Sequence, residues 1–230
     1  MDIKQILPHG LVVSCQAAPD SPLRDSAIMA AMARAALIGG AIGIRADAPS
    51  DIAAIRAVVP LPIIGIYKQH IPTFEVYITP TLDSARDVIN AGANLLAVDS
   101  TNRLRPGGLT ANAFIKKCKA ELNVPVMADI STFEEAISAA EAGADLVATT
   151  LVGFTPYSQP ISLPDFQLIE RLVKFCPVPI VVEGHVSTPE EARLAFDLGA
   201  YAVVVGAAIT QPQWITRRFM EAINASVNRI

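Results

Sequence analysis

The sequence predicts an α/β protein, a (β/α)8 TIM barrel that forms a single domain over residues 1–230. The first observation is that short apolar runs alternate with helix-like segments along the whole chain. The second is an internal repeat, in which a helix-like segment ends in glycine and alanine before the next apolar run, at Gly40, Gly92, Gly143 and Gly199. These glycines lie 92−40=52, 143−92=51 and 199−143=56 residues apart, which suggests a module of two strand–helix units used four times.

A doubly wound open sheet is the competing fold, because it shows the same alternation of strands and helices. The chain contains no G-x-G-x-x-G opening after an apolar run, which is the usual mark of the dinucleotide-binding version of that fold. We therefore favour the closed barrel.

Composition excludes several classes of protein. Hydrophobic residues make up 52% of the chain and charged ones 17%, so a large core can form and disorder is disfavoured. The net charge is −4 without a lysine or arginine run, so we expect no nucleic-acid partner and no membrane partner. Cys15, Cys118 and Cys176 form no C-x-x-C pair, which predicts reduced thiols in the cytoplasm and no metal site. Residues 1–7 lack the apolar stretch of a signal peptide.

Eight short apolar runs are typical of strands that are buried on both faces, as in a parallel barrel. They cover residues 11–15, 41–44, 62–67, 94–98, 124–128, 145–148, 178–182 and 202–205. Three runs carry a proline at or near their start, Pro62, Pro125 and Pro179, where it removes no hydrogen bond from the sheet.

The helices follow from spacing and from their ends. An alanine-rich segment, residues 25–38, stops at Gly39 and Gly40, and Ser50 is expected to cap the next helix, up to about residue 58. Pro189 stands at the first position of a later helix and acidic residues follow it. The remaining helices are expected at residues 81–91, 109–122, 132–142, 164–175, 188–198 and 212–225.

Two long loops interrupt the alternation. Residues 69–80 are interpreted as a lid, with a short extra strand at residues 75–79. Residues 151–163 form the second long loop, and a polar loop covers residues 100–108. A further loop opens at Gly206 after the last strand, and the final helix, with Trp214, is expected to pack against a second subunit.

In a barrel the carboxyl ends of the strands meet on one face, where ligands bind. The residues expected there are Gln16, Arg45, Lys68, Asp99, Asp129, Thr150, Glu183 and Gly206. Lys68 follows a strongly apolar strand near Arg45, and both conditions lower the pKa of an amine and leave it available as a base. The alternative is that Lys68 forms a structural ion pair with Asp99 or Asp129.

Glycines after the last two strands predict an anion site. Gly184 and Gly206 allow backbone N–H groups to approach an anion closely, and loops after strands seven and eight often bind phosphate in barrels. His185 neighbours Gly184, and we expect it on the surface. The histidines are too scattered to predict a catalytic triad or a metal cluster.

Seven motifs taken together resemble the N-acetylmannosamine-6-phosphate 2-epimerase family of bacterial sialic-acid catabolism. They are LPHGLVVSCQA (7–17), GIR (43–45), GIYK (65–68), MADI (127–130), ATTL (148–151), VEG (182–184) and AIT (208–210). The resemblance spans almost the whole chain in the right order, and its first motif is quite specific. It implies a barrel that uses no metal or organic cofactor.

The resemblance also assigns roles to residues. It implies that Lys68 and Glu183 are catalytic and that the substrate, a small phosphorylated amino sugar, is bound by a set of four residues. These four are Gln16, Arg45, Asp129 and Thr150. The phosphate is expected at Gly184, Gly206, Ala207 and Gln211. This chain departs from the family twice there, with Ala207 in place of a second glycine and Gln211 in place of an arginine.

The expected reaction is epimerisation at C2 of the opened sugar, between N-acetylmannosamine 6-phosphate and N-acetylglucosamine 6-phosphate. Lys68 would remove the acidic C2 proton beside the aldehyde, and Glu183 would return a proton on the opposite face. Two alternatives remain open. One is a lyase or aldolase in which Lys68 forms a Schiff base, and the other is a sugar-phosphate-binding barrel without catalysis. We expect the enzyme to be a homodimer.

Overall fold

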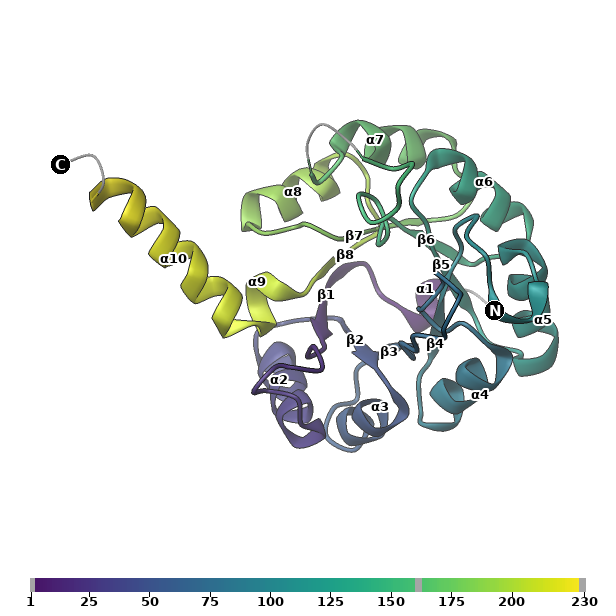
Figure 1. Cartoon of the computed structure of the whole chain (residues 1–230), viewed down its shortest axis with the longest axis horizontal. Helices are drawn as coiled ribbons and strands as arrows, with labels where there is room; N and C mark the ends of the chain where they lie inside the picture. Colours follow the sequence, from purple (N-terminus) through teal and green to yellow (C-terminus); the bar gives the residue numbers. More distant parts are fainter. Residues whose placement is uncertain (1–2, 160–162, 228–230) are drawn as a thin grey trace.

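Eight parallel strands form a closed barrel in the order of the chain (Figure 1). The computed structural model describes residues 3–159 and 163–227, so residues 1–2 of the start and residues 160–162 of the predicted loop 151–163 lie outside the described part. The strands are β1 Gly10–Cys15, β2 Gly43–Asp47, β3 Ile63–Ile66, β4 Leu95–Asp99, β5 Val126–Asp129, β6 Leu146–Ala148, β7 Ile180–Glu183 and β8 Ala202–Val205. Because β1 pairs with both β2 and β8, the barrel closes and the predicted fold class is confirmed.

Helices surround the barrel on its outer side (Figure 1). Seven of them follow the first seven strands: α2 Ser26–Ile38, α3 Pro49–Arg56, α4 Leu82–Asn90, α5 Ala111–Leu122, α6 Phe133–Glu141, α7 Phe166–Phe175 and α8 Pro189–Asp197. After β8 come a short helix, α9 Ala207–Thr210, and a long one, α10 Pro212–Val227, which projects away from the barrel. None of the helices in the described part is long and apolar enough to cross a bilayer.

The internal repeat has a structural cause. The glycines at 40, 92, 143 and 199 each lie two residues beyond the end of α2, α4, α6 or α8, with φ between 90° and 105°. The alanine that follows each glycine donates its N–H to a carbonyl five residues earlier, as in Ala41 to Ala36 at 3.0 Å and Ala144 to Ala139 at 3.0 Å. This is the Schellman ending of a helix, in which a left-handed residue lets the chain turn back. Every second helix therefore ends in the same way.

The prolines expected at strand starts lie just before the strands. The carbonyl oxygens of Pro62, Pro125 and Pro179 accept hydrogen bonds from Ile44, Leu96 and Val147 at 2.9, 3.0 and 3.2 Å. Each proline therefore contributes its carbonyl to the neighbouring strand, and its missing N–H costs no bond, as the sequence predicted.

The interior of the barrel is a packed apolar core. Side chains from several strands fill it, among them Val12, Ile64 and Leu95, which are at most 1% exposed. Leu7 is fully buried among them, and it follows a short helix, α1 Ile3–Ile6, that the sequence did not predict. The end of the barrel away from the strands' carboxyl ends is therefore closed by the chain's own start.

The predicted bounds of the second strand and of the helix after it were wrong. The strand runs to Asp47, so Arg45 lies inside it and not at its end. The helix α3 begins at Pro49, and its N-cap residue is Ala48, so Ser50 does not cap it. Proline is favoured at the first helical position, so the helix begins at Pro49 and not after a Ser50 cap.

The loop between β3 and α4 contains no extra strand. A single antiparallel bridge joins Lys68 to Ile78, and residues 76–80 are mostly buried. The buried Arg105 donates from Nη1 to the carbonyls of Thr79 and Pro80, each at 3.1 Å. This half of the loop is packed and hydrogen-bonded against the rest of the protein, so the interpretation of it as part of a lid was wrong.

Two further boundaries differ. The loop expected from Gly206 turns at once into α9, whose Thr210 donates its hydroxyl to the Ser14 carbonyl at 2.9 Å. The helix expected from residue 164 begins at Phe166 as α7, because Asp165 caps it by accepting a hydrogen bond from the Leu168 N–H at 3.0 Å. A short 3-10 helix, η1 Pro106–Gly108, lies in the loop predicted at residues 100–108.

Candidate active site

A cavity of about 920 Å³ opens at the carboxyl ends of the strands. Nine of the predicted site residues line it: Gln16, Arg45, Lys68, Thr150, Glu183, Gly184, Gly206, Ala207 and Gln211. They come from six strands or the segments that directly follow them, so distant parts of the sequence meet in one place. Asp129 does not line the cavity but bonds to Arg45, whereas Asp99 belongs to a different cluster.

The centre of this site is the guanidinium group of Arg45, which is 1% exposed. Its two terminal nitrogens donate to both carboxylate oxygens of Asp129, at 3.1 and 2.6 Å, and Nη1 also lies 2.5 Å from Glu183 Oε2. Thr150 donates its hydroxyl to Asp129 at 2.7 Å. Burial lowers the pKa of Arg45, but the charges of Asp129 and Glu183 raise it by more, so the group stays protonated.

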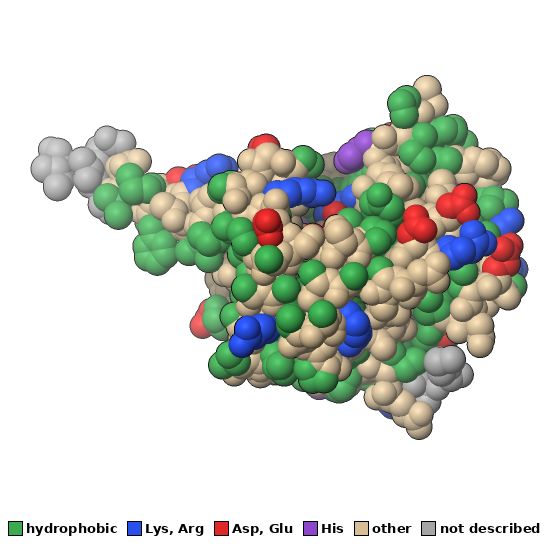
Figure 2. Space-filling model, turned by 90° about the horizontal axis from the view of Figure 1, so that it is seen from below, with side chains coloured by type: hydrophobic (Ala, Val, Ile, Leu, Met, Phe, Trp, Pro, Cys, Tyr) green, Lys and Arg blue, Asp and Glu red, His purple; other side chains and the backbone are tan. Residues whose placement is uncertain are grey.

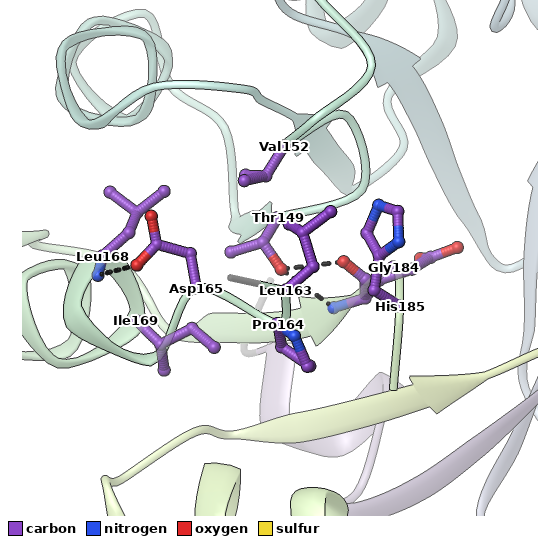
Figure 3. A pocket seen from close by; sticks show the side chains of 10 residues that line it. Thr149, Val152, Leu163, Pro164, Asp165, Leu168, Ile169, Gly184 and His185 are labelled. Carbon is purple, nitrogen blue, oxygen red and sulfur yellow. Dashed lines mark hydrogen bonds between the residues drawn. The ribbon is translucent and has the colours of Figure 1, made fainter. Parts of the chain in front are cut away.

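Glu183 stands at the end of β7 with a side chain that is 11% exposed. Burial raises the pKa of its carboxyl to about 7, against the opposing effect of Arg45. The main chain at this point is held by Thr149, whose hydroxyl accepts from the Glu183 N–H at 3.0 Å and donates to the Glu183 carbonyl at 2.9 Å (Figure 3). The acid therefore has a fixed position and a pKa near neutrality.

Lys68 lines the same cavity, two residues beyond the end of β3. Its Nζ donates to Gln16 Oε1 at 2.6 Å, and Gln16 Nε2 donates in turn to Ser14 Oγ at 2.9 Å. The residue is exposed to solvent, yet nearby protein atoms partly desolvate its amine. The resulting desolvation lowers the pKa of the amine; Arg45 lowers it further, whereas Asp47, Glu183 and Asp129 raise it.

The structural ion pair considered for Lys68 is absent from the described part of the chain, because both of its candidate partners are taken. Asp129 pairs with Arg45, and Asp99 pairs with Arg103 at 2.5 Å. Asp99 also accepts from the Thr101 hydroxyl at 2.7 Å. Expecting Asp99 in the cavity was wrong, because its side chain is fully buried and bonded to the loop that follows β4.

The predicted phosphate residues line the same cavity. Gly184 has φ +94°, a conformation that favours glycine, and Gly206 is the residue before α9. Gln211, just before α10, and Trp214, in the first turn of α10, also line it. Arg218 lies nearby, with its guanidinium 4.8 Å from the centre of the Trp214 ring.

Sequence reasoning missed several residues of the cavity. Asp47 lines it and was overlooked because the second strand was ended too early; Pro49 at the start of α3 was the signal that could have revealed it. Tyr77 lines it too, in the second half of the loop 69–80, which was interpreted from the sequence as a lid. His185 is exposed, as expected, but lines the mouth of the cavity and stacks on Phe154 with ring centres 4.9 Å apart. No group of three or more metal-binding side chains occurs among residues 3–159 and 163–227.

Comparison with known proteins decides the family. The profile of a family described as "Putative N-acetylmannosamine-6-phosphate epimerase" matches residues 29–225. A relative from Caldanaerobacter subterraneus named for this 2-epimerase activity is 51% identical, over 97% of this chain and 94% of its own. A relative from Clostridioides difficile with the same name is 47% identical, over 93% of this chain and 95% of its own. The chain belongs to the N-acetylmannosamine-6-phosphate 2-epimerase family.

Solved structures agree with the family assignment. The structure of the N-acetylmannosamine-6-phosphate 2-epimerase from Clostridium perfringens matches with a TM-score of 0.89 and 45% identity, over 94% of each chain. A thiamine phosphate pyrophosphorylase from Pyrococcus furiosus matches with a TM-score of 0.60 at 18% identity, which indicates a shared fold alone. The resemblance seen in the sequence motifs is thus confirmed at the level of the family.

Proposed function

We propose that this chain interconverts N-acetylmannosamine 6-phosphate and N-acetylglucosamine 6-phosphate. The observation that carries the proposal is the meeting of an amine and a carboxyl group of shifted pKa, Lys68 and Glu183, in one cavity of a chain that belongs to this epimerase family. Pairs of titratable groups whose surroundings shift their pKa values are typical of acid–base catalysis.

Each proposed role follows from the chemistry of the opened sugar. Its C2 proton lies next to the aldehyde and is acidic enough for a positioned base, which we assign to Lys68. Negative charge then develops on the aldehyde oxygen, and the fixed guanidinium of Arg45 is the group that can stabilise it. Glu183 returns a proton to C2 on the opposite face. Gln16 binds the Lys68 amine, and Thr150 and Asp129 hold Arg45 in place.

In this proposal the phosphate is bound at the glycines that follow β7 and β8. Backbone N–H groups at Gly184, Gly206 and Ala207 bind its oxygens, and Gln211 adds an uncharged donor. Holding the 6-phosphate, which is remote from C2, positions the reacting carbon between the base and the acid. We expect the reaction to need neither a metal nor an organic cofactor.

The decisive experiment is proton NMR of N-acetylmannosamine 6-phosphate with the enzyme in heavy water. C2 of the sugar is expected to gain deuterium as the epimer forms, and Lys68→Met is expected to abolish both exchange and turnover. The methionine keeps the volume of the side chain and removes the amine. Product that keeps its C2 proton through many turnovers would contradict deprotonation, and a Lys68→Met variant with more than about a tenth of the wild-type rate would exclude Lys68 as the base.

The same experiment separates the alternatives. A lyase or aldolase would split the sugar, and borohydride would trap its Schiff base on Lys68. A binding barrel without catalysis would show neither exchange nor epimerisation. Membership of the epimerase family disfavours both alternatives.

We also propose that the enzyme is a homodimer. α10 carries an exposed apolar stripe of Phe219, Met220 and Ile223, which are 68%, 49% and 53% exposed, and Figure 2 shows hydrophobic side chains along one side of the projecting helix. Among the described residues, no long helix lies between α8 and α2, where the helix after β8 would complete the ring (Figure 1). A second copy can cover the stripe and fill this position with its own α10.

The cytoplasm is the proposed location. All three cysteines are free, and Cys15 and Cys118 are buried, with burial raising the pKa of each thiol to about 12. Unpaired cysteines are typical of a reducing compartment. Fractionation of the native cell, with the protein found outside the soluble cytoplasmic fraction, would contradict this location.

A further inference from the structure

The carboxyl end of β2 contains a carboxylate to which neither the sequence nor the epimerisation scheme assigns a role. Asp47 is the last residue of β2, is 9% exposed and lines the cavity. Its Oδ1 accepts a hydrogen bond from the backbone N–H of Lys68 at 2.9 Å. A side chain of one strand thus holds the main chain just beyond the end of the next strand, at the residue that carries the proposed base.

A second bond fixes the same two strand ends to each other. The backbone N–H of Ala48 donates to the carbonyl of Ile66 at 2.9 Å, so β2 and β3 are joined one residue beyond β2 and at the last residue of β3. Together with the bond from the Lys68 N–H to Asp47, this bond ties the main chain at residues 66–68 to the main chain at residues 47–48. The antiparallel bridge from Lys68 to Ile78 holds its other side.

The turn that carries Asp47 has an unusual backbone. Ala48 has φ 71° and ψ 146°, at the edge of a region that only glycine occupies readily. The ψ value suits the following Pro49, but the positive φ is unfavourable for a residue with a Cβ. Such a conformation persists only where the surrounding contacts enforce it, and it occurs preferentially at functional sites. Here those contacts are the two bonds to β3 and the start of α3.

The charge of Asp47 acts on the amine as well as on the main chain. Among the charged groups that act on Lys68, namely Asp47 and Arg45 of β2, Glu183 of β7 and Asp129 of β5, Asp47 has the largest effect. Burial raises the pKa of Asp47, whereas Lys68 and Arg24 lower it and Asp51 raises it. Lys68 and Asp47 are therefore an interacting pair, in which the carboxylate favours the protonated amine.

We propose that Asp47 is the positioning residue of Lys68, with a carboxylate that fixes the main chain at residue 68 and a charge that sets how readily the amine gives up its proton. The inference rests on the proposed function, because it takes Lys68 to be the base. Asp47 itself transfers no proton to the sugar. Its two effects can be separated by substitution, since asparagine keeps the acceptor oxygen and loses the charge, whereas alanine loses both.

The test compares Asp47→Asn with Asp47→Ala in the pH dependence of kcat, where titration of the free substrate's phosphate does not contribute. Removing the negative charge makes the ammonium form of Lys68 less favourable. The acidic limb of the Asp47→Asn profile is therefore expected about one pH unit lower than in the wild type. Asp47→Ala is expected to share this shift and, in addition, to lower kcat about tenfold or more relative to Asp47→Asn, with KM little changed.

Ala48→Gly is the matched control, because it alters the same turn and leaves the carboxylate in place. Glycine adopts the observed backbone without strain, so the pH profile should match the wild type, while the melting temperature should not fall. Melting curves of all variants show whether Asp47→Ala is folded under the assay conditions. If it is not, the limb shift of Asp47→Asn still tests the charge.

Two results would overturn the inference. One is an Asp47→Asn profile that superimposes on the wild type, and the other is a folded Asp47→Ala variant with the same kcat as Asp47→Asn. Both differ from failure of the proposed function, which would appear as turnover without Lys68 in the Lys68→Met variant.

Discussion

At the scale of single residues, the guanidinium group of Arg45 balances the negative charges of two carboxylates at the cavity. Arg45 contacts two carboxylates, Asp129 on one side and Glu183 on the other, and it is almost fully buried. Removing one partner from a buried ion pair leaves an uncompensated charge, which is far more costly than losing a pair on the surface. Arg45 therefore serves both the fold and the proposed chemistry, and its substitution cannot separate the two roles.

Glu183 allows a cleaner test, through pH. A proton donor must carry its proton, and burial raises the pKa of Glu183 to about 7, so the donor form is present at neutral pH and is lost as the pH rises further. Lys68 must be neutral, so activity also falls at low pH. We expect a bell-shaped kcat profile, measured by NMR of the sugar, and a loss of roughly 10²–10⁴-fold in Glu183→Gln.

The exposed neighbour Glu190 provides the control, since Glu190→Gln makes the same chemical change on the first turn of α8 and should leave the profile unaltered. A wild-type kcat that continues to rise well above neutrality would contradict the assignment of Glu183 as the proton donor.

The residues expected to bind the phosphate give a second prediction at the scale of single residues. Gln211 lines the cavity without bringing a charge, and Gln211→Arg is expected to lower KM for the 6-phosphate about three- to thirtyfold, with kcat little changed. The contact should also become more sensitive to salt. The measurement is KM at two ionic strengths.

Gln213→Arg adds the same charge at an exposed position two residues further along, and it separates a direct contact from general attraction. An unchanged KM in Gln211→Arg would mean that the phosphate is already held by a cation. Arg218 is the candidate, because it donates to the Ser187 carbonyl at 3.2 Å and packs on Trp214, and both of these residues line the cavity.

What could be predicted at the residue scale depended on where strands end. Lys68, Glu183 and Gly206 were correctly placed because apolar runs stop abruptly beside them. Arg45 was expected at a strand end and lies in mid-strand, because a buried arginine with two carboxylate partners cannot be recognised from its immediate neighbours in the sequence. The same error hid Asp47.

At the scale of elements, the alternation of helix endings explains the period of the repeat. α2, α4, α6 and α8 end in a left-handed glycine, whereas α5 ends at Asn123 with φ 48° and α7 ends in an extended Cys176. The long elements could be predicted because burial on both faces leaves continuous apolar runs. The helices α1 and α9, of four residues each, could not, since they are too short to show a helical period.

Two adjacent glycines allow this ending to be tested. Gly40 has φ +90° with open space around its Cβ position, whereas Gly39 has φ −73° in the ordinary helical region. Gly40→Ala is therefore expected to lower the free energy of unfolding by about 1–2 kcal/mol through backbone strain alone. Gly39→Ala is expected to be neutral, or to raise it by about 0.4–1 kcal/mol. Urea unfolding of both variants checks this, and equal effects would contradict the conformational explanation.

The whole molecule is asymmetric because its last described helix, α10, projects away from the ring of helices (Figure 1). The apolar stripe on α10 predicts a dimer at micromolar concentration, and Phe219→Asp is expected to shift it to monomers, since a charge would be buried without a partner. Sedimentation or light scattering measures the mass. Ala225→Asp introduces the same charge on the opposite side of the helix, because residue 225 is neither three nor four residues from any member of the stripe, and it should leave the dimer intact. A wild-type monomer, or a Phe219→Asp dimer, would contradict the proposal.

The barrel is closed at the end away from the strands' carboxyl ends, and this has a consequence for kinetics. Leu7 is fully buried among the side chains that fill the interior, so the cavity is open to solvent at the carboxyl ends of the strands. The two epimers differ at a single carbon and must use the same entrance and the same binding contacts. Each sugar therefore excludes the other, and either epimer should inhibit the conversion of its partner in a purely competitive manner. Net flux is then governed by the ratio of the two sugars in the surrounding solution.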